Sequence, residues 1–139
     1  MRQGFRLLDH TADFGLEIYG ADPAALFTQA AEALFEMITD PVPPGRGHER
    51  RIEIEGADWP DLLVNWLREL LYLWNGEGEL LCEVAIASIS ENRLQALVTS
   101  VPYDAQRHNI RNEIKAVTYH QVDVGQQEGG WVARVYFDV

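Results

Sequence analysis

The segment Leu62-Leu63-Val64-Asn65-Trp66-Leu67-Arg68-Glu69-Leu70-Leu71-Tyr72-Leu73 decides how this chain folds. Its apolar residues recur at spacings of three and four, which predicts an amphipathic helix. The polar face is narrow, so we expect most of the helix surface to be covered and the helix to form the centre of the core. The helix is predicted to begin at Asp58 or Trp59 and to end at Asn75-Gly76, with Gly76 in the left-handed conformation.

A second helix is predicted upstream of this segment. Asp22 can cap its first turn, and Pro23 follows at a position where a missing N–H does no harm. Apolar residues then recur at helical spacing until the pattern stops near Asp40-Pro41. These residues are Leu26, Phe27, Ala30, Ala31, Leu34, Phe35 and Ile38.

The other apolar segments alternate with polar residues, which is typical of strands. They span residues 14–19, 51–55, 82–86, 94–98, 114–124 and 131–137, and residues 125–130 are predicted to form a hairpin loop. Strands follow one another instead of alternating with helices, which favours an α+β fold over a parallel α/β sheet. We therefore predict a single α+β domain over residues 1–139, with mainly antiparallel sheets packed against two main helices.

The chain is strongly acidic. Its 139 residues include 22 Asp and Glu against 11 Lys and Arg, which gives a net charge of -11. Such a surface repels phosphate backbones, so we expect no direct high-affinity binding of nucleic acid, and a basic protein partner or a bound cation is favoured. The single cysteine, Cys82, excludes a disulfide framework and fits a reducing compartment. No signal peptide or membrane-spanning run is recognised, so a cytoplasmic protein without membrane association is expected.

Two groups of polar residues are candidates for metal binding. The stretch Asp9-His10-Thr11-Ala12-Asp13 precedes the strand at Phe14, and the chain ends in Phe137-Asp138-Val139. If the last predicted strand lies beside the first, Asp13 and Asp138 meet, and a hard divalent cation would relieve their repulsion. Val139 adds main-chain and terminal carboxylate oxygens. By composition alone, a turn with a hydrogen-bonded histidine and a solvated terminal Asp are the more common outcomes.

A third candidate group lies on the predicted strand over residues 114–124. Alternation places Lys115, Val117 and Tyr119 on one face and His120 on the other, beside small and apolar residues. On this pattern His120 is interpreted as a hydrogen-bonded core residue and Lys115 as a surface charge. The density of polar groups on one strand keeps both residues among the candidates for a functional role.

Taken together, four segments resemble the archease family in order and spacing. What the resemblance implies is an accessory protein that is not itself an enzyme. Archeases assist RtcB-type RNA ligases, which join RNA ends carrying a 2′,3′-cyclic phosphate or 3′-phosphate to a 5′-hydroxyl, and they promote guanylylation of the ligase and multiple turnover. The resembling segments are Asp9-His10-Thr11-Ala12-Asp13-Phe14-Gly15, the helix over residues 62–73, and the strands over residues 113–120 and 131–139.

The resemblance also implies a metal site. By position, the ligands of the family fall on Asp13, Asp138 and Val139, with Ca²⁺ expected as the bound ion and Mg²⁺ or Mn²⁺ as alternatives. His10, Lys115 and His120 match other motif positions, and no role is assigned to them.

Three other functions remain open at this point. One is a chaperone-like modulator of a tRNA-modifying enzyme such as a methyltransferase. Another is a metal-dependent hydrolase built on Asp13, His10 and Asp138. The third is an interaction module that binds no ion.

Overall fold

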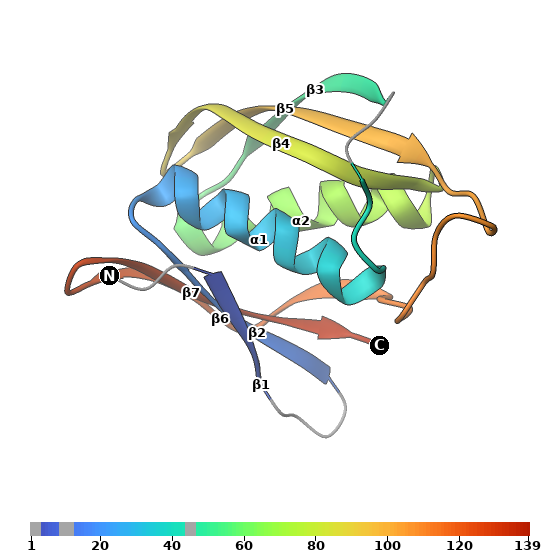
Figure 1. Ribbon diagram of the computed structural model, residues 1–139. Helices are drawn as coiled ribbons and strands as arrows, with labels where there is room; N and C mark the ends of the chain where they lie inside the picture. Colours follow the sequence, from blue (N-terminus) through green and yellow to red (C-terminus); the bar gives the residue numbers. More distant parts are fainter. Residues whose placement is uncertain (1–3, 9–12, 44–46) are drawn as a thin grey trace.

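The two helices of the protein lie between two antiparallel sheets, giving three layers (Figure 1). The computed structural model describes residues 4–8, 13–43 and 47–139. The larger sheet has the strand order β1-β2-β7-β6 and the smaller β3-β5-β4, which confirms the predicted α+β class. The elements are β1 (Gly4–Leu8), β2 (Asp13–Gly20), α1 (Pro23–Ile38), β3 (His48–Glu55), α2 (Trp59–Asn75), β4 (Glu79–Ser90), β5 (Arg93–Pro102), β6 (Ala116–Gln127) and β7 (Gly130–Asp138).

Helix α2 occupies the predicted central position. Trp66 is fully buried, and its indole Nε1 donates a hydrogen bond to the backbone oxygen of Phe27 on α1 at 3.0 Å. This bond joins the two helices inside the core and satisfies the polar atom of the largest buried side chain. The buried residues of α2 are Leu62, Leu63, Val64, Trp66, Leu67, Leu70, Leu71 and Leu73.

Both helices begin with the predicted capping residues. Asp22 Oδ1 accepts from the N–H of Ala25 at 2.8 Å, and Asp58 Oδ1 accepts from the N–H of Asp61 at 2.9 Å. Each bond satisfies one of the free N–H groups of a first helical turn.

The same tripeptide, Gly-Ala-Asp, leads from a strand into each helix, at residues 20–22 and 56–58. Both glycines allow the first helical turn to pack directly on the strand end. A Cβ at Gly56 would lie 2.6 Å from the backbone nitrogen of Leu62, and one at Gly20 would overlap the backbone of Leu26. Only a residue without a side chain fits at these two positions.

Replacing Gly56 with alanine is therefore expected to destabilise the fold by about 1–3 kcal/mol, because a backbone contact must give way to the new methyl group. Gly125→Ala is the matched control, since no atom lies within 4 Å of a Cβ built there. Urea unfolding of both variants measures the difference. Equal stability of the two variants would contradict the close contact between Gly56 and α2.

The end of α2 differs from the prediction. Gly76 has φ -94° and ψ -37°, which is right-handed, and the left-handed glycine is Gly78 at φ +68°. The ring of Tyr72, which is 59% exposed, lies over Gly76 at the position that a Cβ would take.

The predicted hairpin loop over residues 125–130 is too long. Strand β6 continues to Gln127, which pairs with Gly130, so that Glu128 and Gly129 alone connect β6 to β7. Gly129 has φ +80°, a conformation that glycine adopts without strain. Backbone pairing thus extends into residues whose side chains gave no strand signal.

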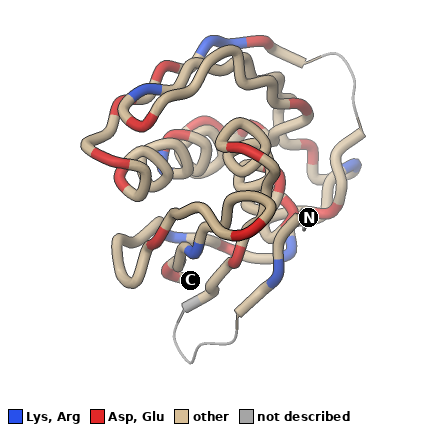
Figure 2. Tube along the Cα trace, turned by 90° about the vertical axis from the view of Figure 1, so that its left-hand side faces the viewer, with Lys and Arg blue, Asp and Glu red and all other residues tan. Residues whose placement is uncertain are grey.

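Strand β1 was not predicted from the sequence, and it adds an edge to the larger sheet beside β2. No helix in the described part of the chain is long and apolar enough to cross a membrane. Acidic residues are spread over the helices and the sheets, with fewer basic residues between them (Figure 2).

Candidate functional site

The ends of three strands, β2, β7 and β6, lie side by side where the larger sheet ends near the C-terminus. In the antiparallel register, Asp138 of β7 lies opposite Asp13 of β2 on one side and Ala116 of β6 on the other. Residues opposite each other in such pairs have Cβ atoms about 4.5–5.5 Å apart. The strand pairing therefore brings Asp13 and Asp138 to adjacent positions.

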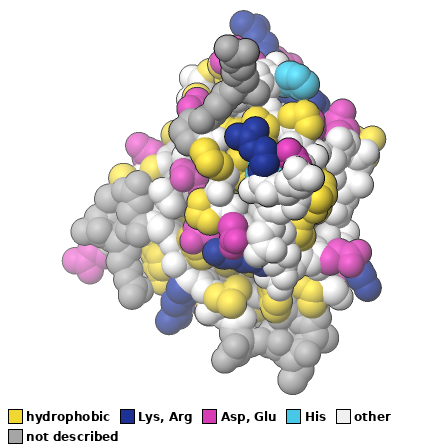
Figure 3. All heavy atoms as spheres, turned by 45° about the vertical axis from the view of Figure 1, so that its right-hand side comes forward, with side chains coloured by type: hydrophobic (Ala, Val, Ile, Leu, Met, Phe, Trp, Pro, Cys, Tyr) yellow, Lys and Arg dark blue, Asp and Glu magenta, His cyan; other side chains and the backbone are white. Residues whose placement is uncertain are grey.

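The last residues of β7 alternate as the sequence predicts. Phe137 is fully buried, Asp138 is exposed on the opposite face, and Val139 is 42% exposed. His10 lies outside the described residues, and of Asp13 only the backbone is described. On this side of the molecule, hydrophobic side chains are exposed in small groups between charged ones (Figure 3).

The donor atoms at this edge suit a hard cation. No three His, Cys, Asp or Glu side chains come together as a metal site within the residues that the structure describes. A site here therefore depends on the carboxylates of Asp13 and Asp138 and on main-chain oxygens such as those of Val139. Carboxylate and carbonyl oxygens are the ligands that Ca²⁺ and Mg²⁺ prefer, and residues of like charge at directly opposite strand positions destabilise the pairing. The residues fit such an ion, and the metal site stays a prediction.

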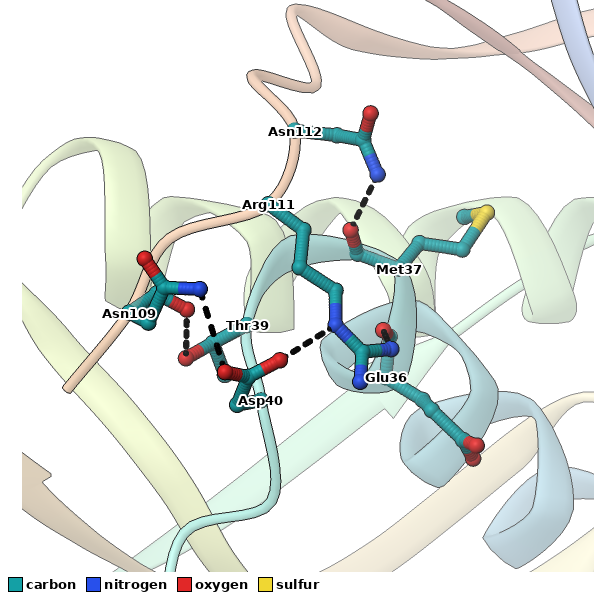
Figure 4. Close-up of polar contacts among 7 residues, drawn as sticks. All are labelled: Glu36, Met37, Thr39, Asp40, Asn109, Arg111 and Asn112. Atoms are coloured by element: carbon teal, nitrogen blue, oxygen red, sulfur yellow. Dashed lines mark hydrogen bonds and ion pairs between the residues drawn. The ribbon is translucent and has the colours of Figure 1, made fainter.

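The segment that leads into β6 is held against the end of α1 (Figure 4). The Nη1 of Arg111 donates to the backbone oxygen of Glu36 at 3.1 Å. The side-chain Nδ2 of Asn112 donates to the backbone oxygen of Met37 at 2.7 Å. Helix α1 has no basic residue in its last turn. Donors from this loop therefore satisfy the free carbonyls at the helix end and place a positive charge near its negative pole.

Asp40 completes this contact. It accepts from the Nε of Arg111 at 2.6 Å and from the side chain of Asn109 at 3.1 Å. These hydrogen bonds, that of Asn109 first, hold the pKa of Asp40 below its ordinary value of 3.8. The carboxylate thus stays charged and keeps the loop in place at neutral pH.

The other end of the same segment contacts α2 and β7. Asn75 at the end of α2 donates through Nδ2 to the backbone oxygen of Ile114 at 2.9 Å. The N–H of Lys115 donates to the backbone oxygen of Asp138 at 2.8 Å. The side chain of Lys115 is exposed, in agreement with its interpretation as a surface charge, and its backbone lies beside the paired aspartates.

The prediction for His120 is wrong, because its side chain is exposed. The pairing of β6 with β7 shifts between Thr118 and Asp123, and Gln121 adopts a positive φ of 55°. The core assignment failed because it chose the wrong face of β6: Val117 is 2% exposed and lies opposite the buried Phe137, so His120 shares the outer face with Thr118. The ring of His120 instead lies on the outer face, 6.2 Å from that of Tyr136.

Sequence reasoning missed one buried charge on the outer face of the larger sheet. Glu17 is only 8% exposed, accepts hydrogen bonds from Tyr19 and from Arg134 Nη2, the latter at 2.9 Å, and pairs with Arg6 at 3.2 Å. The hydrogen bonds from Tyr19 and Arg134, with the charge of Arg6, hold the pKa of Glu17 below its ordinary value of 4.5, against the opposite effect of burial. Alternation in β2 predicts an exposed Glu17, and only the neighbouring strands reveal its partners.

Because the folded pKa of Glu17 is lowered, its charge stabilises the fold above about pH 4.5, and this stabilisation disappears as the pH falls through the folded pKa. We expect Glu17→Gln to be less stable than the wild type near neutral pH, with the difference shrinking in acid. Urea unfolding between about pH 7 and about pH 3 measures it. Glu91→Gln, at an exposed turn, should show no such change with pH. A Glu17→Gln difference independent of pH would contradict this account.

Comparisons with known proteins identify the family. The profile of the Archease protein family (MTH1598/TM1083) matches residues 5–139. The protein archease of Methanopyrus kandleri is 33% identical over 135 residues, which cover 95% of this chain and 96% of that protein. The protein archease of Methanothermobacter thermautotrophicus is 34% identical over 139 residues, which cover 99% of each chain.

Two solved structures have the same fold. The solution structure of Methanobacterium thermoautotrophicum protein 1598 aligns with a TM-score of 0.79 and 33% identity, covering 98% of this chain and 99% of that one. The crystal structure of an archease and possible chaperone from Thermotoga maritima aligns with a TM-score of 0.64 and 22% identity, covering 100% of this chain and 98% of that one. The resemblance inferred from the motifs is thus confirmed: the chain belongs to the archease family.

Proposed function

We propose that this protein is an accessory protein of the cytoplasm, not itself an enzyme, that activates an RtcB-type RNA ligase in tRNA splicing or RNA repair. It promotes guanylylation of the ligase and multiple turnover through a divalent cation held by Asp13, Asp138 and Val139. Membership of the archease family supports the accessory role. The observation that carries the metal part of the proposal is the register that sets Asp13 opposite Asp138.

The surrounding residues suit this role. Asp138 and Val139 are exposed at the end of the sheet, where a large partner can reach them. Hydrogen bonds to the main chain from Lys115 and within the β2–β7 pair hold the position of Asp138. When bound, a divalent cation supplies a concentrated positive charge with positions open to phosphate oxygens. Ca²⁺ is the expected ion, and the same oxygens accept Mg²⁺ or Mn²⁺.

The acidic surface also supports this partner. An RNA ligase must be basic around its RNA channel, and a net charge of -11 favours association with such a protein over direct binding of RNA.

The test is single-turnover guanylylation of a purified RtcB-type ligase with GTP, with and without this protein. We expect a faster guanylylation step and more ligation cycles in its presence. Purified protein alone is expected not to turn over nucleotide, and such turnover would favour the hydrolase alternative. A ligase whose rates do not respond would overturn the proposal. Capture of a tRNA methyltransferase in place of a ligase would favour the chaperone-like alternative.

A further inference from the structure

Strand β4 forms an open edge of the smaller sheet. In the order β3-β5-β4, it pairs with β5 on one side, and no strand among the described residues covers the other. An edge of this kind presents N–H and C=O groups that another extended chain can pair with. Helix α1 runs alongside β4 over part of its length (Figure 1).

A groove lies between this edge and α1. It consists of two adjoining hollows of about 310 and 250 Å³, which share Glu32, Leu81 and Cys82 in their walls. Phe35 and Leu81 form an apolar floor and are 5% and 8% exposed. The half-buried Val84 extends the apolar surface along β4. The groove is therefore suited to alternate side chains of an extended peptide.

The walls of the groove carry negative charges that no described residue pairs with. Glu32 and Glu36 are exposed one turn apart on α1, and Glu83 lines the same groove from β4. None of the three side chains has a hydrogen bond or ion pair with another described residue. Like charges at this helical spacing repel and destabilise a helix. Burial, and then the charges of Glu83 and Glu79, raise the pKa of the Cys82 thiol, in agreement with a negative potential in the groove.

The charges select among the occupants that an open edge can accept. A second copy of this chain would bring the same carboxylates face to face, on molecules that each carry a net charge of -11. A basic chain would neutralise them. Register shifts near Cys82 and Ala87 leave only a short regular stretch of β4, Glu83 to Ile86. The backbone hydrogen bonds of this stretch are too few to hold any extended chain whatever its sequence. An occupant must add contacts from its side chains.

We propose that the edge of β4 and the groove beside it, termed here the β4 groove (Glu32, Phe35, Glu36, Leu81, Glu83 and Val84), bind an extended basic segment of a partner protein by strand addition. The apolar side chains of the segment lie on the face of Leu81 and Val84, beside α1, and its lysine or arginine side chains lie on the other face with Glu83. Glu32 and Glu36 on α1 add to the negative potential that attracts the basic segment. This surface is distinct from the paired aspartates, and its test does not depend on the ligase or on a metal.

The probe is a peptide of about ten residues that alternates lysine and valine, titrated into ¹⁵N-labelled protein. Amide shifts are expected at residues 81–86 and 32–42, and alkylation of the single cysteine, Cys82, should slow when the peptide binds. The combined variant Glu32→Gln, Glu36→Gln and Glu83→Gln should bind at least about tenfold more weakly.

The matched control variant combines Glu69→Gln, Glu91→Gln and Glu128→Gln, which are exposed elsewhere. It changes the net charge equally and should weaken binding by less than about twofold. Equal weakening by both variants would overturn the proposal, because it would show unspecific attraction.

Strand addition has its own test. Two further peptides carry N-methyl groups on the odd or on the even residues, and at least one should lose binding, since strand pairing needs the N–H groups on one side of the peptide. Unchanged binding of both would overturn the strand geometry. Sedimentation that shows a dimer with amide shifts confined to β4 would overturn the partner assignment in favour of a second copy.

Discussion

Asp138→Asn and Asp13→Asn are each expected to reduce the guanylylation rate of the ligase to its unstimulated level. Asparagine keeps the size of the side chain but removes the charge that would hold a divalent cation. The fold should survive, because Asp138 is exposed and its side chain contacts no other described residue through a hydrogen bond or ion pair. Single-turnover guanylylation measures the loss, and calorimetric titration with Ca²⁺ measures loss of the ion.

Glu91→Gln is the control for this prediction, since it removes an exposed carboxylate from the other sheet and should stimulate like the wild type. If both aspartate variants stimulate fully, the metal mechanism is wrong while the accessory role stands. If the wild type itself fails to stimulate, the accessory role is wrong whatever the variants do.

Trp66→Ala should have the largest effect on stability, a loss of about 3–5 kcal/mol. The substitution leaves a cavity between the helices and removes the donor to the backbone oxygen of Phe27. Small domains are stable by only about 5–15 kcal/mol, so this variant should be close to unfolding at room temperature. Unfolding in urea, followed by circular dichroism, measures the loss.

Two controls separate the contributions. Trp66→Phe keeps most of the volume and loses the hydrogen bond, so it should be destabilised by about 1–3 kcal/mol. Trp74→Ala removes a half-buried tryptophan from the same helix, where the ring contacts Tyr103 at 5.4 Å between centroids, and it should be tolerated better than Trp66→Ala. A loss as large for Trp74→Ala would contradict the central role of Trp66.

Local signals were sufficient to predict both helices. Each has an aspartate cap, a proline in the first turn and a long apolar repeat, and all three depend only on residues close in sequence. The strands are harder, since their pattern is set by what packs on each face. Strand β1 was missed because Arg6 and Leu7 in its centre are both exposed, which leaves no clear alternation.

The candidate site needed information that one sequence does not carry. The pairing of Asp13 with Asp138 depends on β2 and β7 being neighbours, and alternation does not reveal strand order. The burial of Glu17 depends on Arg6 and Arg134, which come from two other strands. The exposure of His120 follows from Val117 facing the core opposite Phe137, and alternation alone does not tell which face of a strand is buried.

The loop over residues 109–115 has a thermodynamic consequence for any ligand at the paired aspartates. Arg111 and Asn112 fix it to α1, and Lys115 fixes its far end to the main chain of Asp138. The backbone on this side of the site is therefore preorganised before a ligand arrives. Binding there loses little further conformational entropy, and a larger share of the contact energy becomes affinity.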